Sequence, residues 1–153
     1  MRRLLIGLTI SLFAFSSTVS ASSAADAIVG TWLTNDGTAK VEIVDANGVY
    51  NGHVVWLKAP RFPADDSQGM AGKPKVDRLN PDASLRARPV MGMVMLSGLR
   101  FSGEHGWDGG TLYAPASGKS YPCKLSLGSD GSLKVSVGGG IFGKTVTWTR
   151  SAD

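Results

Sequence analysis

Hydrophobic and polar side chains alternate along most of the chain, and turn residues separate the alternating runs. In residues 38–45, for example, Ala39, Val41 and Ile43 alternate with charged side chains. A period of two predicts a strand with one buried face and one face in water. Turn signals recur at a spacing of about 8 to 12 residues, which is typical of an all-β sandwich or barrel.

Eight runs have this strand-like pattern. They cover residues 28–34, 38–45, 49–57, 90–101, 107–114, 119–127, 132–137 and 145–150. Short strands joined by hairpins predict an eight-stranded antiparallel up-and-down barrel, because closure removes the exposed sheet edges. A two-sheet sandwich is the alternative. One long loop is predicted between strands 3 and 4, and within it residues 81–88 have room for one or two helical turns.

The N-terminus has the pattern of a secretory signal peptide. A positive start at residues 1–3 precedes an apolar run over 4–15 and then small residues. The apolar run has about 12 residues, shorter than the roughly 20 of a membrane span, although an uncleaved anchor is the alternative. We expect a leader over 1–24, cleaved after Ala21 or Ala24, and a periplasmic or secreted product without an integral membrane span.

The expected mature protein, without the leader, has the size of one domain and a small net charge. Residues 26–153 have the length of a single domain, predicted to be the β-barrel. The formal net charge is +4, but Arg2 and Arg3 belong to the leader. Charge is therefore a poor argument for nucleic-acid binding. The single cysteine, Cys123, excludes an internal disulfide and is expected to be a small buried hydrophobe.

The first and last strands carry residues suited to closing a barrel. Gly30 and Trp32 form a G-x-W sequence on the first strand, and Trp148 and Arg150 lie on the last. The two strands are neighbours in a closed barrel, so a guanidinium can lie over the indole of Trp32. This pairing resembles the signature of the calycin and lipocalin barrels, which implies a structural closure role for these four residues.

A wider set of motifs resembles one bacterial family. The set comprises Gly30-x-Trp32, Asp77-x-x-Asn80-Pro81-Asp82, Leu85-Arg86-x-Arg88-Pro89 with Gly92, Trp107-x-x-Gly110, Gly118-Lys119-x-Tyr121 and Gly143-x-x-x-x-Trp148-x-Arg150. Together they are similar to the exported proteins of domain-of-unknown-function family 2147. The resemblance spans about residues 28–150. It implies a calycin-like fold and transfers no biochemical activity.

The long segment over residues 58–89 is the first candidate site. It contains five of the seven prolines and seven Lys or Arg against four Asp. A loop of this length in a compact domain is functional or disordered. One hypothesis is a lid that meets an anionic group with Asp77, Asn80, Arg86 and Arg88. The alternative is a solvated loop in which Asp77 and Asn80 cap turns and Arg86 pairs with a carboxylate.

Soft and aromatic side chains give a second candidate site inside the barrel. Methionine adapts to irregular apolar ligands, although a methionine stripe also fits a packed core. The fourth predicted strand places methionines at alternate positions, and aromatic residues on neighbouring strands are candidates to line the same cavity. The residues are Met91, Met93, Met95, Trp56, Trp107 and Tyr113.

No catalytic or metal-binding constellation is assembled in the sequence. The two histidines, His53 and His105, lie in different segments, and the spacing of a zinc or calcium site is absent. No nucleophile elbow is present. We therefore expect no metal, no cofactor and no enzymatic activity; an enzyme using loop carboxylates is the least supported hypothesis.

Two functional hypotheses remain. In the first, the barrel is an exported protein of the cell envelope that binds a small apolar or amphipathic ligand. In the second, the barrel is solid and binds an envelope protein or anionic lipid through its surface or its basic loop. The state of the barrel interior distinguishes them, because a cavity of a few hundred Å³ favours a ligand, whereas a filled core favours the surface-binding module.

Overall fold

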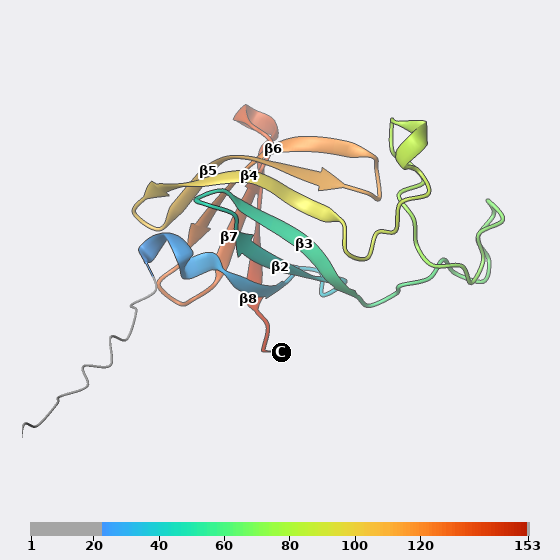
Figure 1. Cartoon of the computed structure of the whole chain (residues 1–153), viewed down its shortest axis with the longest axis horizontal. Helices are drawn as coiled ribbons and strands as arrows, with labels where there is room; N and C mark the ends of the chain where they lie inside the picture. Colours follow the sequence, from blue (N-terminus) through green and yellow to red (C-terminus); the bar gives the residue numbers. More distant parts are fainter. Residues whose placement is uncertain (1–22, 153) are drawn as a thin grey trace, which may run out of the picture.

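Eight antiparallel strands close into a barrel in the computed structural model, which describes residues 23–152 (Figure 1). Each strand pairs with the next in chain order, and β1 also pairs with β8. The predicted up-and-down barrel is confirmed, and the two-sheet alternative is wrong. The predicted leader over residues 1–24 lies, apart from its last two residues, outside the described range.

The strands follow the predicted order. They are β1 Gly30–Leu33, β2 Ala39–Asp45, β3 Tyr50–Leu57, β4 Val94–Gly103, β5 Gly106–Ala114, β6 Lys119–Leu127, β7 Leu133–Val137 and β8 Lys144–Arg150. Three 3-10 turns complete the described structure: η1 Ala24–Ile28, η2 Ala83–Leu85 and η3 Gly140–Phe142. Seven of the eight strand starts fall within two residues of the prediction.

The fourth strand starts later than predicted, at Val94 in place of Val90. Gly92 has a φ of +82°, a conformation that favours glycine, and the amide of Met93 donates to the carbonyl of Val90. These features make residues 90–93 a turn. The alternation of apolar residues predicts a strand over residues 90–93, whereas the backbone bends before β4 begins.

Because neighbouring strands run in opposite directions, successive connections lie at opposite ends of the barrel. The β2–β3, β4–β5 and β6–β7 turns share one end with η1, which we call the capped end. The β1–β2, β5–β6 and β7–β8 turns share the other end with the long β3–β4 connection over residues 58–93. We call this the loop end. Figure 1 shows η1 on the left and the long loop on the right.

Large apolar side chains fill the interior. The largest that are fully buried include Trp32, Trp107 and Trp148, together with Leu96 and Leu99. Glycine is required where the walls come closest: a Cβ on Gly110 would lie 2.5 Å from Leu99 Cγ. Cys123 is buried in this same cluster, as expected. This part of the barrel is a packed core.

The turn η1 closes the capped end through hydrogen bonds from the barrel wall. Trp32 Nε1 donates to Ile28 O at 2.8 Å, Trp107 Nε1 to Ala25 O at 3.0 Å, and Tyr50 Oη to Asp26 Oδ1 at 2.9 Å. Ile28 is itself fully buried. The two indole donors thus bond carbonyl oxygens of this short 3-10 turn, at Ile28 and Ala25, and tie it to the barrel wall.

Arg150 joins the last strand to this closure. Its guanidinium donates to Ala27 O at 2.7 Å and to Val29 O at 3.0 Å. The guanidinium carbon also lies 4.3 Å from the centre of the Trp32 ring. Gly30 leaves space for this arrangement, because a Cβ there would lie 2.9 Å from an Arg150 nitrogen. Trp148 lies two residues earlier, in the core.

Candidate functional site

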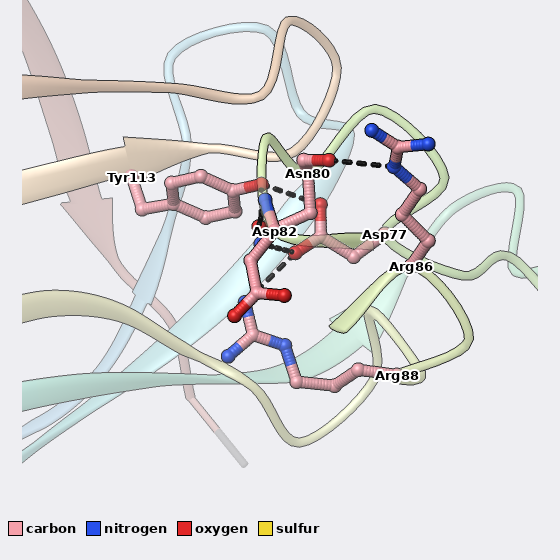
Figure 2. Close-up of polar contacts among 6 residues, drawn as sticks. All are labelled: Asp77, Asn80, Asp82, Arg86, Arg88 and Tyr113. Atoms are coloured by element: carbon pink, nitrogen blue, oxygen red, sulfur yellow. Dashed lines mark hydrogen bonds and ion pairs between the residues drawn. The ribbon is translucent and has the colours of Figure 1, made fainter. Parts of the chain in front are cut away.

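A buried carboxylate joins the long loop to the barrel. Asp77 is fully buried and accepts three hydrogen bonds: from Tyr113 Oη at 2.6 Å, from Asn80 Nδ2 at 2.7 Å and from Arg88 at 2.7 Å (Figure 2). Tyr113 belongs to β5, whereas the other three residues belong to the loop. We call these four residues the Asp77 cluster.

Local turn chemistry places Asn80 and its neighbours. Asn80 precedes a proline and is therefore biased to extended backbone. Its side-chain oxygen accepts from the amide of Asp82 at 2.9 Å, and Asp82 in turn caps η2 through the amide of Ser84. These Asx contacts form the turns that the sequence predicts for this segment. They fix the amide nitrogen of Asn80 so that it meets Asp77.

The same stretch packs on the β5–β6 turn. The carbonyl of Leu79 lies so close to Gly118 that a Cβ on this glycine would be 1.9 Å from the oxygen. Gly118 also has a φ of +66°. Only glycine satisfies both conditions. The loop is thus held to β5 by the Asp77 cluster and to the adjoining turn by backbone contact.

The cluster shifts the pKa values of its acidic groups in opposite directions. Burial acts to raise the pKa of Asp77, but hydrogen bonds from Tyr113, Asn80 and Arg88 outweigh it, so the pKa lies below its ordinary value. For Tyr113, burial and the bond to Asp77 raise the pKa to about 12. At neutral pH the pair is therefore a carboxylate and a neutral phenol.

Two of the four loop arginines, Arg86 and Arg88, were candidate site residues, and the structure gives them different partners. Arg86 Nε donates to the backbone carbonyl of Asn80 at 2.8 Å, so the predicted pairing of Arg86 with a carboxylate is wrong. Arg88 makes that pair instead, with Asp77. A guanidinium can donate its hydrogen bonds either to a backbone carbonyl or to a carboxylate, and the sequence does not show which of these acceptors it meets.

The Asp77 cluster is built for anchoring. A carboxylate that is fully buried and already accepts three donors offers no approach to a substrate. General acid–base work needs a group within hydrogen-bond reach of the reacting atom. What the arrangement can do is hold about thirty residues of loop in one position at the loop end.

The predicted methionine stripe is not a stripe. Met91 is exposed and Met93 is buried, and both precede β4. Met93 packs with Val54 and Val90 in a second small cluster, which Met95 and Tyr113 flank. Because the turn interrupts the period of two, the three methionines do not share one strand face.

The other predicted cavity residues lie far apart. Trp107 is fully buried beneath η1 at the capped end. Trp56 is 39% exposed and pairs across the sheet with Lys40, in a shallow outer hollow. The expected common cavity of Trp56, Trp107 and the methionines is therefore wrong. Alternation of apolar and polar residues does not show which end of the barrel a side chain lies at. It also does not show where a bulge, such as the register shift between Lys40 and Val41, moves the following side chains to the other face of the sheet.

The inner wall at the loop end carries partly exposed apolar side chains. Tyr121 lies opposite the buried Leu112, and Val146 lies opposite the buried Val135. Directly opposed residues share a face of the sheet, so these side chains point inward. They are only partly buried, as are others on this wall: Leu57, Met95, Ala114 and Val137.

Of this wall, sequence reasoning singled out only Met95 as a candidate site residue. Tyr121 and Val137 alternate with core residues such as Cys123 and Val135, so their sequence pattern is that of the core. Their proximity to turns was the available signal, because inward residues next to a barrel mouth are the ones that a neighbouring turn can leave uncovered.

Two further structural features concern metals and membranes. Among residues 23–152, no three His, Cys, Asp or Glu side chains gather as a metal site. Within the same described residues, no helix has the length and apolarity to cross a bilayer.

Comparisons with known proteins agree with the barrel fold described above. The family model described as "Uncharacterized protein conserved in bacteria (DUF2147)" matches residues 30–150. Among solved structures, the chain is similar to protein HP1028 from the human pathogen Helicobacter pylori, which is described as belonging to the lipocalin family. The two are 29% identical with a TM-score of 0.67, and the match covers 82% of this chain and 84% of that one. No curated protein matches the sequence.

Proposed function

This chain belongs to the DUF2147 family and has a lipocalin-like barrel, and on that basis we propose that it binds a small apolar or amphipathic molecule at the loop end. Eight-stranded barrels of this kind are wide enough to hold one small ligand. We further propose that the protein works outside the cytoplasm, in the cell envelope. The signal-peptide pattern of the N-terminus supports that location.

One observation carries the proposal: burial changes along the barrel interior. Toward the capped end most inward side chains, such as Trp32, Trp107 and Leu133, are fully buried, and Leu127 opposite Leu133 is partly buried. Toward the loop end Tyr121 and Val146 remain partly exposed, although their opposed neighbours are buried. Apolar side chains on a concave inner wall are suited to an apolar ligand group. The ligand therefore occupies the mouth, because aromatic side chains already fill the deep interior.

The basic loop supports an amphipathic ligand. Lys58 follows the end of β3 directly, and Lys73 and Arg86 are exposed at the same end of the barrel. A ligand with an apolar tail in the mouth would present its polar head near these cations. An anionic head group would gain charge-assisted contacts there.

Filling the mouth tests this proposal. Ala114 packs on the core at the loop end of β5, whereas Thr111 is exposed on the same strand. Anilinonaphthalene sulfonate, an amphipathic fluorescent probe, should bind the native protein. The probe should bind Ala114→Phe weaker by about tenfold, equivalent to about 1.4 kcal/mol. Thr111→Phe is the matched control and should bind as the native protein does.

Two outcomes would overturn the proposal. Either the native protein fails to bind the probe, or both variants bind it equally well. Circular dichroism would establish that each variant is folded. Native mass spectrometry of protein purified from the cell envelope would identify a co-purifying molecule, and its fraction should fall in Ala114→Phe.

A further inference from the structure

Exposed apolar side chains gather at one end of the barrel. Among the described residues, the exposed large hydrophobics at the capped end are Val29 and Phe101. The others lie in the loop-end half: Val55, Trp56, Leu79, Leu85, Met91, Val94 and Ile141. Single exposed apolar residues need no explanation, but their concentration at one end marks an interaction surface.

Ile141 is the most exposed of them. It lies in η3 between β7 and β8, and 92% of its surface is accessible to solvent. Glycines precede it at positions 138–140, and Lys144 begins the next strand. The side chain therefore covers no core of its own barrel. An apolar tip on a turn flanked by a cation is suited to the boundary between lipid head groups and acyl chains.

Charge is divided between the same two ends. The capped-end connections carry Asp26, Glu104 and Asp130 and contain no lysine or arginine; Asp45 at the end of β2 and Arg150 at the end of β8 border them. The loop end carries the seven Lys and Arg of the long loop against four Asp. Asp36 also lies at this end, and Lys119 and Lys144 border its turns.

Part of this positive charge is unpaired within the described range. Arg78 pairs with Asp66 at 2.6 Å and Arg88 with Asp77 at 2.7 Å. No ion pair holds the remaining loop cations among the described residues: Lys58, Arg61, Lys73, Lys75 and Arg86. These side chains are therefore available to an external anion. Attraction of this kind falls off within a Debye length of the surface.

We propose that the loop end is a docking surface for an anionic lipid bilayer. The unpaired cations meet the lipid head groups, and Ile141 with the exposed loop leucines enters the interfacial region. The acidic capped end faces away from the membrane, because like charges repel. This inference goes beyond ligand binding and does not require it. It adds that the barrel mouth faces the lipid.

A lipid surface fits the arrangement better than a single protein partner does. The apolar side chains are spaced over several segments with cations between them, whereas the core of a protein interface is depleted in charge. Interfacial membrane binding combines scattered apolar anchors with lysine and arginine.

Vesicle sedimentation tests the docking surface. The purified protein should sediment with vesicles of phosphatidylcholine and phosphatidylglycerol and remain in solution with phosphatidylcholine alone. The bound fraction should fall as salt is added, because the attraction is screened. Equal binding to both vesicles, or binding to neither, would overturn the proposal.

Paired variants locate the surface. Ile141→Ser, and Lys73→Glu with Lys75→Glu, should each weaken binding to the anionic vesicles by about tenfold. Val29→Ser, and Lys124→Glu with Lys134→Glu, make matched changes away from the loop end and should bind as the native protein does. If the control variants lose as much binding, or if the loop-end variants lose none, the assignment of the surface is wrong.

The outcomes separate docking from ligand binding. Ala114→Phe, which is expected to lose the fluorescent probe, should still sediment with anionic vesicles. Conversely, Ile141→Ser should still bind the probe. Loss of both properties in either variant, with circular dichroism unchanged, would contradict the independence of the two surfaces.

Discussion

The two ends of the barrel contain the same kind of polar pair in different settings. At the capped end Tyr50 donates to Asp26 at 2.9 Å, and at the loop end Tyr113 donates to Asp77 at 2.6 Å. The first pair accompanies a turn that closes a filled core. The second anchors a long loop beside a partly uncovered inner wall. Closure at one end thus supplies stability, whereas the other end keeps apolar side chains of the inner wall partly exposed.

The largest expected effect is at the capped end. Trp32→Ala removes a fully buried indole that packs in the core and donates to Ile28, so we expect a loss of about 3–5 kcal/mol in the free energy of unfolding. Urea denaturation measures it. Trp56→Ala removes a partly exposed indole and should cost about 1 kcal/mol or less. Similar losses in both variants would contradict the contrast between filled core and outer wall.

A smaller loss is expected where the last strand meets the cap. Arg150→Ala removes two hydrogen bonds to η1 and its flank, together with the stacking on Trp32. Because Arg150 is exposed, we expect a loss of about 1–2 kcal/mol and a lower melting temperature. An unchanged melting curve would show that the pairing does not contribute to closure. Arg100→Ala, another exposed arginine, serves as control.

The smallest expected effect is local and depends on pH. Since the pKa of Asp77 is lowered, its stabilisation of the loop is complete above about pH 4 and is lost as the pH falls through the folded-state pKa. The pKa of Tyr113 is raised to about 12, so its contribution is complete below about pH 10 and is lost as the pH rises through about 12. The anchor is therefore strongest between these limits.

NMR of the Arg88 side-chain Nε–H signal follows this anchor. The signal should change as the pH falls below about 4, and the Asp77→Asn variant should lack that transition. Signals from η1 should report the Asp26 pair separately, and Asp77→Asn should leave them unchanged. An acid transition that persists in Asp77→Asn would assign the effect to another carboxyl group.

Most of the fold could be predicted from local pattern. Period-two alternation and glycine-containing turns located all eight strands, and Gly30 with Trp32 indicated how the barrel begins. The prediction was wrong where a local pattern has two structural outcomes. Met91 and Met93 alternate like strand residues, yet the positive φ of Gly92 bends the chain between them.

The candidate site was harder to predict, because its contacts are long-range. The sequence singled out Asp77 and Asn80 as turn residues, which is correct for Asn80. It could not show that Tyr113 on β5, 36 residues away, would donate to Asp77. Nor could it show which inward side chains stay partly uncovered, because Tyr121 and Cys123 have the same pattern on β6 and differ only in their distance from the mouth.

The contacts of Arg150 have a consequence for how the chain folds. They join residues 121 and 123 positions apart in the sequence, and strand β1 can complete its pairing only when β8 is present. Folding rates fall as such distant contacts come to dominate a topology. The barrel therefore closes last, and only after synthesis has delivered its final strand. Until then the chain presents two open sheet edges, which makes the unclosed intermediate the species most prone to aggregate.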